Sequence, residues 1–196
     1  MKPTVISFFT PLYREHAETL IKSCNDLGYK YYVEPLPNQG TWEKNQSLKA
    51  SFILKCWRYY KHVLWIDADA KIIRPLDIFI NEIWFDFAVF RRPHKRMPFR
   101  TGTLYFGERN SNEAFLLDWS EACNADINEF DQVHIVQAWR KHKDYIQTYF
   151  LPVSYCQKYN EQTTNDGLGV NPDPNPHIIH YMASAHLKQS NHHMKS

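Results

Sequence analysis

The stretch that most constrains this chain is an apolar run that ends in two acids, Val63-Leu64-Trp65-Ile66-Asp67-Ala68-Asp69. Four consecutive apolar residues leave no polar face, so they predict a fully buried strand. Alternate side chains of an extended chain point the same way, so we expect Asp67 and Asp69 to share one side. Open α/β sheets form their ligand crevice at the carboxyl ends of such strands.

Two carboxylates side by side repel each other unless a cation or a proton lies between them. A hard divalent ion, held by one or two carboxylates and completed by substrate phosphates, meets that requirement. Asp67 and Asp69 therefore predict a metal site at the end of a central strand. The alternative is a strand that ends in a solvated acidic turn.

The rest of the chain alternates strand-like and helix-like segments. Strands are expected at residues 4–9, 29–34, 63–66, 85–90, 101–106, 145–151 and 177–181. Helices are expected up to a stop at Gly28, from near Glu43, after a cap at Asn110 or Ser111, and after a cap at Asn128. This order predicts an α/β fold with a mixed, mostly parallel central sheet flanked by helices. Residues 1–188 are expected to form one domain, and residues 189–196 a frayed tail.

Composition excludes several classes of protein. A hydrophobic content of 43% in 196 residues indicates a folded chain, and a net charge of +2 gives no global attraction to nucleic acid or membrane. The four cysteines form no C-x-x-C pair and are typical of reduced thiols. The N-terminus has no signal-peptide pattern, and no run of about 18 apolar residues predicts a membrane span. We therefore expect a cytoplasmic protein.

Four ordered pieces of the chain resemble the GT-A glycosyltransferases, the nucleotide-diphospho-sugar transferase superfamily that includes glycogenin-like enzymes. They are residues 64–69, residues 101–106, Asp131-Gln132, and residues 177–180. Each piece is weak alone, but their order and spacing together are fairly specific, and the region over which they are spread is most of the chain. The resemblance implies a single Rossmann-like domain that transfers a sugar from a nucleoside diphosphate sugar to an acceptor.

The resemblance also implies a metal site made of Asp67, Asp69 and His180. In such enzymes Mn²⁺ or Mg²⁺ bridges the diphosphate and stabilises the charge that grows on it as the glycosidic bond breaks. An imidazole ligand suits Mn²⁺ better than Mg²⁺. The alternative is that His177 and His180 are ordinary polar residues at the end of a strand.

A set of donor-binding residues follows from the same resemblance, with a uridine diphosphate sugar favoured. The set is Thr10, Tyr13, Lys49, Asp67, Ala68, Arg91, Gly102, Thr103 and Lys188. Tyr13 offers a flat face to the base, Gly102 permits close approach of the backbone, and Lys188 could pair with the diphosphate. Thr10 could equally cap a helix, and the lysines could equally be solvated.

Asp131 and Gln132 are the residues that the resemblance places at the reaction centre. Asp131 would bind sugar hydroxyls, and Gln132 would lie near the anomeric carbon of a retaining enzyme. An acid in the first turn of a helix is also favourable for the helix dipole alone, so a purely structural role stays open for Asp131.

Residues 91–100 form a basic loop with Arg91, Arg92, Lys95, Arg96 and Arg100. The loop is either solvated or binds phosphates of the acceptor, which keeps a DNA acceptor open. A non-catalytic nucleic-acid-binding module built on this loop is one alternative function, but it leaves Asp67 and Asp69 unexplained.

Two other classes of enzyme are alternatives to a glycosyltransferase. A haloacid-dehalogenase-like phosphohydrolase also ends a strand in D-x-D and uses the first Asp as a nucleophile. That family normally has Thr or Val where this chain has Lys71. A sugar nucleotidyltransferase needs a glycine-rich loop after its first strand, and residues 8–12 contain no glycine.

Overall fold

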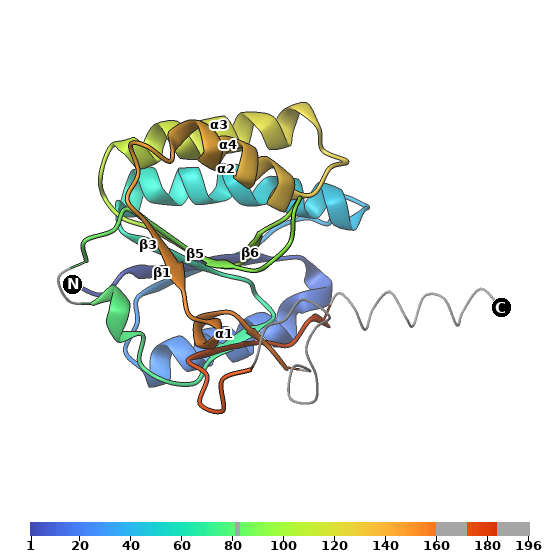
Figure 1. Cartoon of the computed structure of the whole chain (residues 1–196). Coiled ribbons are helices and arrows are strands. Elements are labelled where there is room, and N and C mark those ends of the chain that lie inside the picture. Colours follow the sequence, from blue (N-terminus) through green and yellow to red (C-terminus); the bar gives the residue numbers. More distant parts are fainter. Residues whose placement is uncertain (81–82, 160–171, 184–196) are drawn as a thin grey trace.

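The computed structural model describes residues 1–80, 83–159 and 172–183. A six-stranded sheet separates two layers, with α2, α3 and α4 on one face and α1 on the other (Figure 1). The helices are α1 Arg14–Asp26, α2 Trp42–Tyr60, α3 Ser111–Ala125 and α4 Asp131–His142. The strands are β1 Thr4–Phe9, β2 Tyr31–Pro35, β3 Val63–Ile66, β4 Ala70–Ile72, β5 Phe87–Arg91, β6 Phe99–Phe106, β7 Thr148–Leu151, β8 Gln157–Lys158 and β9 Ile178–His180.

The large sheet has the strand order β2-β1-β3-β6-β5-β7. β1 pairs in parallel with β2 and β3, and β5 pairs in parallel with β7, whereas β6 is antiparallel to both of its neighbours. The predicted α/β class with a mixed, mostly parallel sheet is therefore confirmed. Because β3 and β5 run in the same direction, both end at the sheet edge where β6 begins.

A second, three-stranded sheet with the order β4-β9-β8 was not expected. β4 and β8 have three and two residues, which is too short for a pattern of alternation to show in the sequence. β4 pairs antiparallel with β9, and Ala70 lies opposite His180. This small sheet thus places β9 beside the residues that follow β3.

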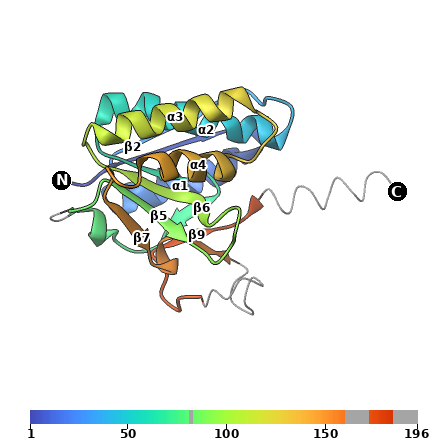
Figure 2. The same cartoon turned by 45° about the horizontal axis from the view of Figure 1, so that its top comes forward.

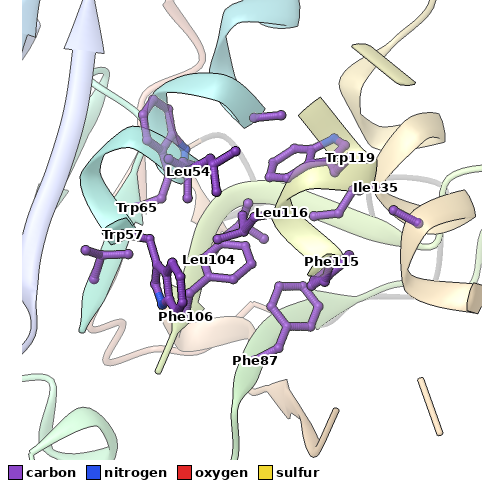
Figure 3. Packing of buried hydrophobic residues seen from close by; sticks show 14 of the residues in the cluster. Leu54, Trp57, Trp65, Phe87, Leu104, Phe106, Phe115, Leu116, Trp119 and Ile135 are labelled. Atoms are coloured by element: carbon purple, nitrogen blue, oxygen red, sulfur yellow. The ribbon is translucent and has the colours of Figure 1, made fainter. Parts of the chain in front are cut away.

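β3 is buried on both faces, as its four apolar residues predicted. Trp65 packs into an aromatic core beneath α2, α3 and α4, together with Trp57, Phe106 and Trp119 (Figure 3). Leu64 and Ile66 point into the opposite core, beneath α1 and the small sheet. Burial on two sides fixes the position of the residues that end the strand.

The expected helix ends were partly right. Gly28 follows α1 with φ +66, a left-handed conformation that favours glycine at the end of a helix. α2 begins at Trp42, one residue before the expected start, and Thr41 Oγ1 accepts a hydrogen bond from Lys44 N at 3.2 Å. The expected cap at Asn128 is wrong, because α4 begins at Asp131 with Phe130 in the cap position.

The described cysteines are all buried and free. Among the described residues, no helix combines the length and the apolar character needed to cross a membrane. Residues 160–171 and the residues from 184 on, which include the tail expected at 189–196, lie outside the described residues.

Candidate active site

Asp67, Ala68 and Asp69 form an acidic turn directly after β3. Ala70 N donates a hydrogen bond to Asp67 O at 3.0 Å, which closes the turn. Asp67 N donates to Gly102 O at 2.8 Å and ties the turn to β6. The extended conformation expected for Asp67 to Asp69 is therefore wrong, although the two carboxylates do lie on one side as expected. The carboxylates converge because the chain turns back between them.

His180 completes a group of three potential ligands. One ligand atom from each of Asp67, Asp69 and His180 lies within 4.8 Å of the others. Two hydrogen bonds connect the turn to the residues that follow β9. Asp69 O accepts from Tyr181 N at 2.8 Å, and Asp69 Oδ2 accepts from Ala183 N at 2.9 Å. Two carboxylates and one imidazole are a donor set that Mn²⁺ accepts, so the residues fit the expected ion.

Burial sets the charge of this group. Burial, with the Asp67 carboxylate adding to it, raises the pKa of Asp69 to about 6. Burial also lowers the pKa of His180 to about 4. At neutral pH the imidazole of His180 is therefore in the uncharged form that binds metal ions. At neutral pH Asp69 is ionised, but its burial beside Asp67 makes the ionised form unfavourable in free energy. A cation between the carboxylates would offset this.

Gly102 and Thr103 lie against the ring of His180. A Cβ atom at Gly102 would lie 2.8 Å from His180 Cε1 and 3.0 Å from Nδ1. Thr103 Oγ1 lies 3.0 Å from His180 Nε2. When Nε2 carries the proton and donates to Thr103, Nδ1 keeps a lone pair for a metal ion. These two residues, expected at the donor, thus have a direct contact with the third ligand.

Lys49 is buried between two acids. Its Nζ lies 3.0 Å from Asp67 Oδ1 and 3.4 Å from Asp131 Oδ2. Burial alone would lower the pKa of Lys49, but the carboxylates of Asp131 and Asp67 outweigh it, and the pKa is raised. Lys49 is therefore a fixed cation that links the acidic turn to the start of α4.

Two partners of this network were missed by the sequence analysis. Trp65 Nε1 donates to Asp67 Oδ1 at 2.8 Å, and Thr101 Oγ1 donates to Asp131 Oδ2 at 2.9 Å. Trp65 was recognised only as an apolar strand residue, although its indole N–H is a donor that must find a partner when buried. That requirement is the one sequence signal that could have found it.

A cavity of about 320 Å³ opens beside the acidic turn. Six of the expected site residues line it: Thr10, Tyr13, Lys49, Asp67, Ala68 and Asp69. Thr10 occupies the cap position of the helical turn Pro11–Tyr13, as its structural alternative predicted, but its side chain makes no capping hydrogen bond. Trp42 and Gln46 of α2 also line the cavity and were not expected there.

Asp131, Gln132 and Arg91 are not among the residues that line this cavity. Asp131 is fully buried against Lys49, and Gln132 Oε1 accepts from Arg92 Nη2 at 3.0 Å. Arg91 is exposed, and its guanidinium lies 5.2 Å from the ring centre of Phe150. Lys188 lies outside the described residues.

His177 has a different environment from His180. Its ring stacks on that of Tyr155 at a centroid distance of 4.4 Å, and Nδ1 lies 2.7 Å from Pro75 O. These contacts anchor the start of β9, so His177 is a structural residue in this fold.

No protein-family model matches the chain, and no curated protein sequence matches it. The fold is similar to that of solved glycosyltransferases. A glycosyltransferase involved in the glycosylation of the major capsid of PBCV-1 aligns over 100% of both chains, with a TM-score of 0.70 and 13% identity. Mouse xyloside xylosyltransferase 1 aligns over 94% of this chain and 99% of its own, with a TM-score of 0.56 and 10% identity.

The galactosyltransferase LgtC, solved with donor and acceptor sugar analogues, aligns over 91% of this chain and 87% of its own. Its TM-score is 0.56 at 10% identity. At these identities the likeness concerns the fold. The chain has the GT-A-like fold of glycosyltransferases, as the four sequence pieces implied.

Proposed function

We propose that this protein is a metal-dependent glycosyltransferase that moves a sugar from a nucleoside diphosphate sugar to an acceptor. The observation that carries the proposal is the convergence of Asp67, Asp69 and His180 next to a cavity of about 320 Å³ at the carboxyl edge of the sheet. Ligands of open α/β sheets bind at this edge. The glycosyltransferase fold of the chain supports the same reaction class.

Asp67, Asp69 and His180 would hold Mn²⁺, or Mg²⁺ in its place. A divalent ion at this position supplies positive charge to the leaving nucleoside diphosphate. The chain keeps the three ligands ready, because Trp65 and Lys49 orient Asp67 and the backbone of Ala183 orients Asp69. Mn²⁺ is favoured because one ligand is an imidazole.

The donor would lie along the sheet edge with its base at the end of β1. Tyr13 and Thr10 line that end of the cavity, where Tyr13 provides a ring for stacking and Thr10 a hydroxyl. The diphosphate would lie at the acidic turn after β3, and the sugar would extend toward β6. A uridine diphosphate sugar is the donor we favour.

Transfer with retention of configuration is the stereochemistry we propose. Among the described residues that line the cavity, Asp67 and Asp69 are the only carboxylates. An inverting transferase needs a general base for the acceptor hydroxyl, and Asp131 is buried against Lys49. Asp131 would act on the site through Lys49, and Gln132, in the first turn of α4, stays our candidate beside the anomeric carbon.

A screen of nucleotide sugars tests the proposal. Purified protein is incubated with each donor and Mn²⁺ or EDTA, and release of the nucleoside diphosphate is measured. We expect Mn²⁺-dependent release from one class of donor, and an increase in melting temperature with uridine diphosphate only when Mn²⁺ is present. Proton NMR of the product then determines the anomeric configuration of the transferred sugar, which retention requires to be that of the donor.

The same screen separates the alternative functions. Hydrolysis of a simple phosphomonoester without sugar transfer would identify a phosphohydrolase. Stabilisation by DNA without metal would identify a binding module. The free, buried cysteines support the cytoplasm as its compartment. Localisation of the tagged protein in its host tests that part of the proposal.

A further inference from the structure

The basic loop (residues 91–100) lies at the same edge of the sheet as the acidic turn. β5 ends at Arg91, β6 begins at Phe99, and the tip of the loop joins these two antiparallel strands. β5 has the same direction as β3, so the loop that follows β5 lies at the edge of the sheet where Asp67 and Asp69 follow β3. Figure 2 shows β5 and β6 side by side, with α4 above them.

This loop lies outside the cavity we assign to the nucleotide. The described lining of that cavity comes from β1 and residues 10–13 after it, residues 38–41, α2, Trp65 of β3 and the acidic turn, and it contains no residue of the basic loop. β6 lies between β3 and β5 in the sheet, so the basic loop is across β6 from the cavity. An acceptor that approaches a sugar held over β6 from that side meets the basic loop.

The loop is held against the start of α4. Arg92 Nη2 donates to Gln132 Oε1 at 3.0 Å, and Arg92 Nε donates to Met97 O at 2.9 Å. Arg96 forms an ion pair with Glu129, just before α4. The loop is thus ordered by contacts with the element that carries Asp131 and Gln132, and its charges have a defined position relative to the site.

The charge of the loop is strongly positive. It contains five Lys and Arg residues and no acid. Arg91, Lys95 and Arg96 are exposed, and Glu129 is the carboxylate paired with the loop among the described residues. Such a set attracts an anion, and two or three cations match one phosphate or carboxylate group.

We propose that the acceptor is a sugar bearing a phosphate or carboxylate group, which the basic loop binds while an acceptor hydroxyl faces the donor sugar. This inference rests on the proposed glycosyltransferase function. A polynucleotide is less suitable, because binding to its backbone depends on Lys and Arg residues that neutralise many successive phosphates. The loop has three exposed cations, and the whole chain has a net charge of +2.

Calorimetric titration tests the proposal with the donor site filled. The protein is saturated with Mn²⁺ and uridine diphosphate, so that anions do not bind at the metal. Glucose 6-phosphate, glucuronate and glucose are then titrated separately. We expect the two anionic sugars to bind at least about tenfold more tightly than glucose, and the stronger of the two tells whether phosphate or carboxylate is preferred.

Two double variants with the same change in charge locate the binding. Lys95→Gln/Arg96→Gln should weaken binding of the anionic sugar at least about tenfold. Lys141→Gln/Lys143→Gln, at the opposite end of α4, should leave binding unchanged. Equal binding by both variants, or no preference of the wild type for anionic sugars, would overturn the proposal.

Two further results are informative. A single-stranded DNA oligonucleotide could bind more tightly than the sugar phosphates at about 150 mM salt and lose affinity in the Lys95→Gln/Arg96→Gln variant. That result would show a nucleic-acid acceptor and overturn the sugar acceptor. Failure of uridine diphosphate and of every other nucleoside diphosphate to bind with Mn²⁺ would instead refute the proposed function. The titrations on the Mn²⁺-loaded protein would then still show whether the loop binds anionic sugars.

Discussion

The imidazole of His180 lies directly against the backbone of Gly102, where a Cβ atom would be 2.8 Å from His180 Cε1. Real Cβ atoms do not approach another heavy atom so closely, so an alanine at position 102 has to displace the ring. The ring cannot move freely, since Nε2 lies 3.0 Å from Thr103 Oγ1. The absence of a side chain at Gly102 is therefore a condition for the position of the His180 ring beside Asp67 and Asp69.

Gly102→Ala should weaken Mn²⁺ binding while the protein stays folded. We expect a loss of at least about tenfold in affinity, comparable to the effect of disturbing a contact that orients a metal ligand. Isothermal titration with Mn²⁺ measures it, and circular dichroism confirms the fold. Thr19→Ala, at an exposed position of α1, is the control for a substitution away from the site. Unchanged affinity in Gly102→Ala would show that His180 is not a ligand.

Asp69→Asn should abolish sugar transfer and leave the fold intact. The amide keeps the size of the carboxylate and can still accept the hydrogen bond from Ala183 N, now 2.9 Å long. It removes one negative charge from the three-ligand group, so Mn²⁺ binding should be lost. Release of nucleoside diphosphate is the measurement, and Asp26→Asn, an exposed residue of α1, is the control. Normal turnover by Asp69→Asn would defeat the assignment of the metal site.

Stability of the metal-free protein should depend on pH through two opposing groups. The pKa of Asp69 is raised to about 6, so its contribution to stability falls as pH rises between about 4 and 6. The pKa of His180 is lowered to about 4, so its contribution is lost as pH falls from about 6.5 to 4. The two effects nearly cancel in the wild type.

Single variants should separate these two effects. Without the Asp69 carboxyl, the melting temperature of Asp69→Asn should rise more steeply with pH over this range than that of the wild type. In His180→Gln it should fall with pH. Mn²⁺ should raise the melting temperature of the wild type more at about pH 7.5 than at pH 5, because protons compete for Asp69. Parallel curves for all three proteins would contradict the assigned shifts.

Lys49→Met should destabilise the protein by about 3–5 kcal/mol, because it leaves the buried Asp131 carboxylate without a counter-charge. Asp131 is fully buried, and one of its oxygens already has no hydrogen-bond partner among the described residues. The double variant Lys49→Met/Asp131→Asn should recover part of the loss. Urea unfolding followed by tryptophan fluorescence measures both. If the double variant is less stable than Lys49→Met, the two charges do not compensate each other.

Tyr13→Ala should weaken binding of uridine diphosphate in the presence of Mn²⁺. Stacking of a base on an aromatic ring contributes about 1–3 kcal/mol, which corresponds to roughly 5- to 150-fold in affinity. Tyr13→Phe keeps the ring and should bind nearly as well as the wild type. Tyr145→Ala, an exposed tyrosine after α4, is the control for loss of a surface ring. Equal binding by Tyr13→Ala and the wild type would show that the base does not stack on Tyr13.

Much of the fold follows from local sequence patterns. β1 has the expected bounds, and α1 ends before Gly28 as expected, because each depends on residues a few positions apart. The buried run of β3 and the acids after it predicted a metal site at this position for the same reason. Six of the expected site residues line one cavity. They follow the adjacent strands β1 and β3 or, for Lys49, lie on α2, the helix that precedes β3.

Only the tertiary structure decided how these residues meet. The acidic turn, the contact of Gly102 with His180, and the buried position of Lys49 depend on pairings between distant parts of the chain. Thr103 and His180 are 77 residues apart, and Asp69 and Ala183 are 114 residues apart. Periodicity reports the conformation of a segment and its buried face, but it carries no information about which distant segment covers that face. For that reason the sequence could predict Asp67, Asp69 and His180 as candidate ligands, while the small sheet β4-β9-β8 determined the geometry in which they converge.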